Sequence, residues 1–166
     1  MTRLRLAVVL VFLTGLPVAA ATLQETYLKL YLEMDDAEQR ELAHDYIRAL
    51  VRFQAAEVCL VKMHANFPDW EPDMVRQRTK DCQEKITELT PLAREELRKL
   101  NDAWPLNDAG MQRDGWSDVD WAQAKLTYWQ LMKGNHPNSD QGTFDAKIRE
   151  QAKVVDGLVT TAVGKP

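Results

Sequence analysis

Cysteine and histidine are scarce in this sequence, and their scarcity excludes several kinds of metal and cofactor site. The chain has two cysteines and three histidines. Glu41-x-x-His44 has the spacing of a di-iron helical bundle, but the second such motif that this site requires is missing. A C-x-x-C-H haem motif, a zinc-ligand spacing, a phosphate-cradling glycine loop and a serine–histidine–acid set are missing too. We therefore predict no bound metal and no cofactor.

A long apolar run is also missing from the N-terminus, which excludes a membrane-spanning helix there. The run over residues 6–16 is about half of the roughly 20 apolar residues that a spanning helix needs. Two arginines precede the run and three alanines follow it, which is the order of a secretory signal peptide. We predict that residues 1–21 are cleaved as a signal peptide. Residues 22–166 would then form a single periplasmic or secreted domain without a membrane span.

Basic residues are outnumbered by acidic ones, 21 to 25, and the formal net charge is −4. Cleavage of the predicted signal peptide would remove two arginines and make the mature chain more acidic still. Nucleic acids and anionic membranes select proteins with a basic face, so this balance argues against both as partners.

Period-two alternation is absent, whereas apolar residues recur every three or four positions along most of the chain. The pattern predicts an all-α fold, a bundle of about four main helices plus a short N-terminal helix. Asp35 and Glu38 match a capping box, so we expect a short helix over residues 22–34 and a long one from there to about residue 66. Further helices are expected over residues 72–104, with a kink or restart at Thr90-Pro91, over residues 117–134, and from about residue 139 or 143 onward.

The long predicted helix has an apolar surface wider than one neighbouring helix would cover. One stripe comprises Leu42, Tyr46, Ala49, Phe53, Ala56, Leu60 and Met63. Val58 and Val61 are among the residues that widen it. We therefore expect other helices to cover this helix on more than one side.

The two cysteines, Cys59 and Cys82, fall on the two helices that a proline-rich turn joins. At about 1.5 Å per residue, Cys59 lies roughly 12 Å from the turn and Cys82 about 15 Å, so the two are nearly level in an antiparallel pair. Exported proteins also meet an oxidising environment. We therefore expect a Cys59–Cys82 disulfide that staples an αα-hairpin. Two free buried cysteines or a two-cysteine metal site are the alternatives.

Helical periodicity is also absent from residues 101–116, a stretch rich in tryptophan and aspartate. This stretch is longer than most helix–helix connections, which have about 2–8 residues. Ser117 with Asp120 then predicts a helix cap. Because tryptophan is enriched in binding hot spots, we predict a partner-binding site here. Its residues would be Trp104, Asp108, Asp114, Trp116 and Trp129. Core packing of the aromatic residues, a solvated loop and a calcium site are the alternatives.

These features favour a non-catalytic exported protein that binds another exported or envelope protein. An inhibitor, an immunity protein or an envelope assembly factor would fit. The hypothesis depends on a rigid helical frame, net acidity and one long loop rich in tryptophan and aspartate. One alternative is a small exported metal-dependent hydrolase that uses loop aspartates with His136 or His44. A second alternative is a carrier whose hydrophobic ligand lies between the helices, against the tryptophans.

Overall fold

The computed structural model describes residues 18–106 and 115–164, with side chains from residue 23 onward. Within these ranges the chain forms five α-helices and no strand. The helices are α1 (Val18–Leu42), α2 (Tyr46–Asn66), α3 (Pro72–Lys99), α5 (Asp118–Asn135) and α6 (Gln141–Val163). The predicted all-helical bundle is therefore confirmed.

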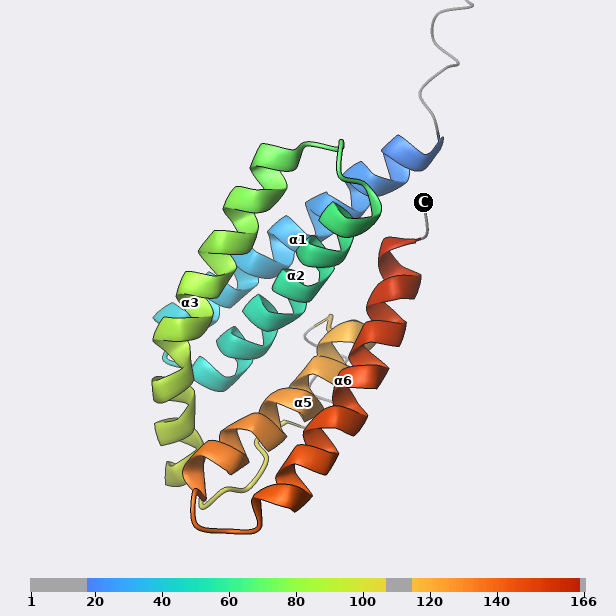
Figure 1. Cartoon of the computed structure of the whole chain (residues 1–166). Helices are drawn as coiled ribbons and strands as arrows, with labels where there is room; N and C mark the ends of the chain where they lie inside the picture. Colours follow the sequence, from blue (N-terminus) through green and yellow to red (C-terminus); the bar gives the residue numbers. More distant parts are fainter. Residues whose placement is uncertain (1–17, 107–114, 165–166) are drawn as a thin grey trace, which may run out of the picture.

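The centre of the bundle is α2, which packs against each of the other four helices. Its contact with α3, the next helix along the chain, is the most extensive, and α5 and α6 form a second packed pair. Figure 1 shows α3 and α6 on opposite sides of α2. Because α3 and α6 do not pack extensively against each other, part of α2 between them lacks a covering helix.

Helix α2 contributes more buried side chains than any other helix. Ile47, Leu50, Phe53, Leu60 and Met63 of this helix are almost inaccessible to solvent. They belong to one cluster that also includes buried residues of the other helices. The predicted apolar stripe is thus correct from Ala49 to Met63, but its first member, Leu42, is exposed at the end of α1.

The first helix boundary was predicted at the wrong place. Helix α1 passes through Asp35 without a break, and the chain turns at His44, which adopts a left-handed φ of 60°. The Asp45 N–H then bonds to the Arg40 carbonyl at 2.9 Å, a helix-terminating geometry. On the other side of the turn, Glu96 of α3 accepts the N–H of Ile47 at 2.9 Å. The start of α2 is therefore supported by a long-range hydrogen bond, which the local sequence pattern does not contain.

Two other helix signals in the sequence had different outcomes. The predicted restart at Thr90-Pro91 is wrong, because α3 continues through Pro91 as one helix of 28 residues. The predicted cap of α5 is confirmed. Ser117 and Asp120 form a reciprocal capping box, with the Ser117 N–H donating to Asp120 Oδ2 at 2.7 Å.

The predicted disulfide is wrong, since Cys59 and Cys82 are both free and buried and do not lie near each other. The spacing along the two helices predicts the height of each cysteine above the turn, but not the side of α2 on which Cys59 lies. Glu57, whose carboxylate faces Gln83 of α3 at 2.9 Å, shows which side of α2 is turned toward α3. Cys59 is two residues further on and therefore about 200° around the helix, away from α3.

Among the described residues, none of the helices has the length and apolar character that crossing a membrane requires.

Candidate functional site

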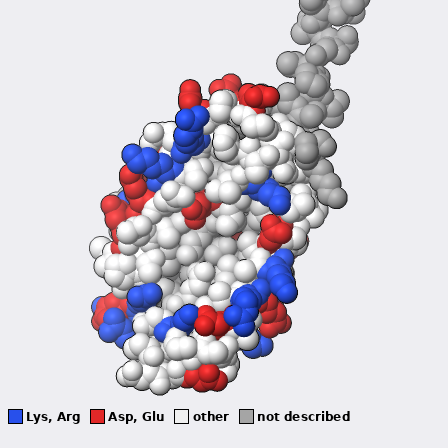
Figure 2. Space-filling view, viewed as in Figure 1, with Lys and Arg blue, Asp and Glu red and all other residues white. Residues whose placement is uncertain are grey.

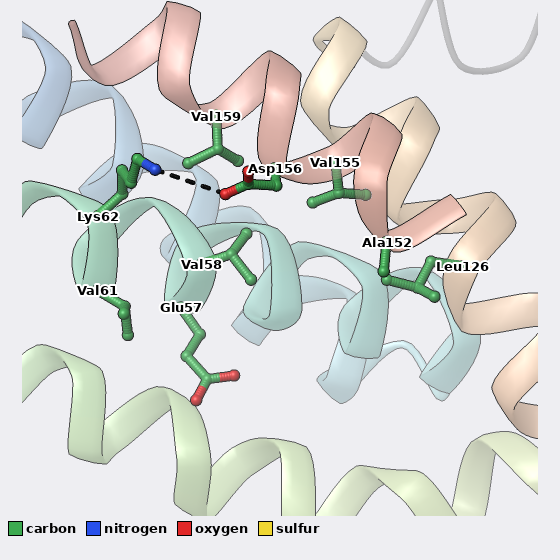
Figure 3. Close-up of a pocket in the computed structure, with 9 residues that line it drawn as sticks. All are labelled: Glu57, Val58, Val61, Lys62, Leu126, Ala152, Val155, Asp156 and Val159. Atoms are coloured by element: carbon green, nitrogen blue, oxygen red, sulfur yellow. Dashed lines mark hydrogen bonds and ion pairs between the residues drawn. The ribbon is translucent and has the colours of Figure 1, made fainter. Parts of the chain in front are cut away.

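A groove of about 340 Å³ with a mostly aliphatic lining runs along α2. It is lined by Glu57, Val58, Val61 and Lys62 of α2, by Leu126 of α5, and by Ala152, Val155, Asp156 and Val159 of α6. Figure 3 shows Val58 of α2 facing Val155 and Val159 of α6, with Val61 on the side of α2 nearer α3. We refer to this hollow as the α2–α6 groove.

The groove exists because short side chains line the gap beside α2. Valine and alanine are too small to close the space between helices that diverge, and no larger side chain from α3 lines it. As a result Val61, in the middle of a packed helix, is 50 % exposed. An exposed apolar side chain in such a position is informative when its neighbours are apolar as well.

Charged side chains lie only at the edges of the groove. The Lys62 ammonium is 3.5 Å from the Asp156 carboxylate, drawn as a dashed line in Figure 3. Asp156 is largely exposed, so this ion pair is weak. Figure 2 shows an uncharged surface over the centre of the molecule with charged residues around it. The groove therefore has an aliphatic interior, with one cation, Lys62, and two carboxylates, Glu57 and Asp156, at its margin.

Beside the groove, buried amides and hydroxyls join α5 to α2. Thr127 and Gln123 of α5 are buried, and Thr127 Oγ1 donates to Gln54 Oε1. Gln123 Nε2 donates to the same oxygen at 3.2 Å, and Gln54 Nε2 donates to Gln130 at 3.4 Å. These bonds hold α5 firmly against α2, so Leu126 is fixed in the groove lining.

A second polar cluster lies on another side of α2, where Arg52 joins α1 to α5. Arg52 Nη1 donates to Asp120 Oδ2 at 2.9 Å, and its Nε donates to Asp36 Oδ2 at 3.2 Å. The guanidinium also lies over the Trp116 ring, 4.9 Å from its centroid. Arg52 and Asp120 are both almost completely buried. The cluster pairs Arg52 with two carboxylates and joins three helices, although Asp120 Oδ1 has no hydrogen-bond partner among the described residues.

The predicted partner-binding residues are placed in two different environments. Trp104 packs against Tyr128 with ring centroids 5.0 Å apart, and Tyr128 packs in turn against Trp129 at 5.2 Å. Trp116 instead lies under the Arg52 guanidinium. All three predicted tryptophans are partly buried. Asp108 and Asp114 lie outside the described residues, so the predicted site remains a prediction.

The hydrolase alternative involved loop aspartates and a histidine, and the structure brings one such pair together. His136 Nε2 lies 2.8 Å from Asp102 Oδ2. Asn135 donates to the other oxygen of Asp102 at 3.4 Å, and the Tyr128 hydroxyl donates to its backbone carbonyl at 3.2 Å. This pair connects the end of α3 to the end of α5. His44 is elsewhere, 2.6 Å from the Tyr46 hydroxyl. Within the described part of the chain, no three metal-ligating side chains gather around one point.

The two cysteines are poor candidates for chemistry. Burial raises the pKa of the Cys59 thiol to about 12, and the charge of Glu33 adds to the effect. Burial likewise raises the pKa of Cys82 to about 12, with Glu57 as the nearest charge that contributes. Because the thiolate is the nucleophile, both groups are unreactive near neutral pH.

Comparisons with known proteins give no functional information, so any proposal about function depends on the geometry. No protein-family model, curated protein or solved structure matches this chain. The residues that sequence reasoning missed are those of the groove, because Val58 and Val61 were expected to be covered. Their signal was the width of the apolar stripe, which exceeds what the neighbouring helices cover.

Proposed function

We propose that this protein binds an amphipathic small molecule, one with a flexible aliphatic chain and an anionic end such as a long-chain carboxylate. The observation that carries the proposal is the α2–α6 groove, whose interior is formed by valine, leucine and alanine side chains and remains open to solvent. When an aliphatic ligand covers such open apolar surface, binding is favoured by about 25 cal/mol for each Å² that is buried.

The size and lining of the groove favour a single chain over a larger ligand. Small-molecule sites typically measure about 300–1,000 Å³. At about 340 Å³ the groove is near the lower limit of that range. Its lining contains no aromatic side chain to stack on a flat ring. A saturated chain, which adapts to an irregular aliphatic surface, is the better match.

Lys62, the one cation of the lining, favours an anionic end at its own edge of the groove, since the Glu57 carboxylate is turned toward α3 and accepts from Gln83. Lys62 is paired at 3.5 Å with a carboxylate that is largely in water. A ligand carboxylate can replace Asp156 beside Lys62 at little cost, since exposed ion pairs contribute only about 0–1 kcal/mol. The chain of the ligand would then extend from Lys62 along Val58 toward Leu126.

This proposal is closest to the carrier alternative from the sequence, but with a different lining. The ligand would lie between α2 and α6 against valines, and not against the tryptophans. The protein-binding role of Trp104, Trp116 and Trp129 stays a separate prediction that the groove does not support.

Isothermal titration calorimetry with octanoate, decanoate and dodecanoate tests the proposal. Each buried methylene contributes up to about 0.8 kcal/mol, and the groove is partly open, so affinity should rise roughly two- to fourfold per methylene. Val61→Phe fills the groove without entering the core and should weaken dodecanoate binding at least about tenfold. Val154→Phe is the matched control, because Val154 is a similarly exposed valine that does not line the groove. It should bind normally.

The anionic end is tested separately with Lys62→Gln, which should weaken dodecanoate binding about two- to fivefold and leave dodecanol binding unchanged. Lys153→Gln, an exposed lysine of α6 outside the lining, is its control. If dodecanoate fails to bind, or if both phenylalanine variants bind equally well, the proposal is wrong.

A further inference from the structure

A second cavity, of about 270 Å³, lies on the side of α2 that is turned toward α1. It is bounded by α1, by the start of α5 and by the last turns of α6, and Cys59 of α2 also lines it. Leu30, Val119 and Leu158 supply most of its apolar wall, and Glu33 and Asp118 supply carboxylates. None of these residues belongs to the α2–α6 groove. We refer to this hollow as the Glu33 cavity.

The Glu33 carboxylate is buried without a close cationic partner. Its side chain is only 12 % exposed. The two nearest cations are Lys29 Nζ at 3.8 Å and Arg52 Nη1 at 3.9 Å, both farther than a hydrogen bond reaches. Arg52 already donates to Asp120 and Asp36. Among the described residues, the charge of Glu33 is therefore incompletely compensated.

The environment of Glu33 also changes the pKa of its carboxyl group. Burial, and then the charge of Asp120, raise the pKa of this carboxyl to about 7. Asp120 itself has a buried Oδ1 with no hydrogen-bond partner among the described residues. The contribution of Asp120 and its unpaired oxygen indicate that a cation beside these two carboxylates would be favourable.

Lys29 shows what kind of group the cavity accepts. Its side chain is 62 % exposed, yet its ammonium is turned to the mouth of the cavity beside Glu33. An exposed side chain that is 3.8 Å from its partner is held weakly and can move into solvent. A ligand ammonium that enters deeper than Lys29 would be able to hydrogen-bond with Glu33 directly.

We propose that the Glu33 cavity binds a small organic ammonium ion, with its charge on Glu33 and its apolar part against Leu30, Val119 and Leu158. This site goes beyond the function proposed above, since it is a different cavity with the opposite preference for charge. An anionic ligand would face Glu33 and Asp118 together. A bare metal ion would lack the cluster of ligands that it needs within the described residues.

The probe is hexylammonium, compared with hexanol and hexanoate, which have the same chain and a different charge. Calorimetric titration at about pH 8, above the pKa of about 7 of Glu33, should show saturable binding of hexylammonium only. Glu33→Gln should weaken it at least about tenfold, the effect of losing a charge-assisted hydrogen bond. Glu25→Gln is the matched control, because Glu25 is an exposed acid on the same helix and does not line the cavity.

The proposal also predicts a variant with a higher affinity for hexylammonium. Lys29→Gln removes the internal competitor and should tighten hexylammonium binding severalfold, which a nonspecific loss of structure in Glu33→Gln cannot imitate. Binding should weaken below about pH 7 as Glu33 takes up a proton. The charged or titratable groups around Glu33 are Lys29 of α1, Arg52 and Cys59 of α2, and Asp118 and Asp120 of α5, with none from the α6 part of the lining.

Val61→Phe separates this site from the α2–α6 groove. It should leave hexylammonium binding unchanged, whereas it should reduce dodecanoate binding. Equal affinity for hexanol and hexylammonium would overturn the ammonium site, as would unchanged binding in Glu33→Gln or loss of binding in Val61→Phe.

Discussion

The two sides of α2 differ in the kind of side chain that they bury and the kind that they expose. Arg52 is a charged residue and its side chain is 4 % exposed, whereas Val61 is apolar and 50 % exposed. The nine residues between them are about two and a half turns at 3.6 residues per turn, so the two side chains point in opposite directions. On one side, α1 and α5 bury a charge against α2, and on the other side the space between α3 and α6 leaves valines open.

This difference shows which side of α2 needs specific partners for the fold to be stable. A buried charge is tolerated only when partners surround it, and Arg52 has two carboxylates and an indole ring. Open valines need no partner in the free protein, but their exposed surface favours association with apolar molecules. The Arg52 side therefore holds the helices in place beside the Glu33 cavity, and the Val61 side contains the aliphatic α2–α6 groove.

The largest expected effect comes from removing the charge on the buried side. Arg52→Met should destabilise the fold by about 3–5 kcal/mol, because Asp120 would be left buried without its cation. Urea unfolding followed by circular dichroism measures this change. Arg76→Met is the control, since Arg76 forms an exposed ion pair with Asp73 and its loss should cost at most about 1 kcal/mol. Equal effects of the two substitutions would break the comparison between the two sides of α2.

A smaller effect is expected from pH on the same side. The pKa of Glu33 is about 7 in the folded chain against the ordinary value of 4.5. Between these values the folded state holds a proton that the unfolded state has released, so this group stabilises the fold at low pH and loses that contribution as pH rises to 7. The difference in unfolding free energy between wild type and Glu33→Gln should change by about 2–3 kcal/mol over this window. A difference that is flat with pH would contradict the burial of Glu33.

The sequence predicted those features that local chemistry determines. The all-helical fold, the cap at Ser117 and Asp120, and most of the apolar stripe of α2 follow from spacing and residue type within one segment. The break at His44 could not be predicted in this way. The turn forms at His44 without a glycine or proline, and Glu96, which caps the start of α2, is distant in sequence.

The candidate sites were harder to predict for a related reason. A valine in an apolar stripe has the same pattern whether a neighbour covers it or not, so Val61 was taken as covered. Glu33 gave no signal, because its unusual acidity comes from Asp120 and from burial among three other helices. Only the tertiary arrangement distinguishes an open valine or a buried carboxylate from an ordinary one.

The smallest expected effect concerns the two cysteines, which again point to different sides of α2. Cys59 is seven residues from Arg52, nearly two turns, and shares its side of the helix, while Cys82 lies near Glu57 on the side turned toward α3. Reductant should therefore leave the melting temperature unchanged. Iodoacetamide should modify neither thiol in the native protein and both in urea, as read by mass spectrometry, because both are buried with a pKa of about 12. A melting temperature that falls on reduction would indicate a disulfide between Cys59 and Cys82. It would contradict the placement of these two cysteines on different sides of α2.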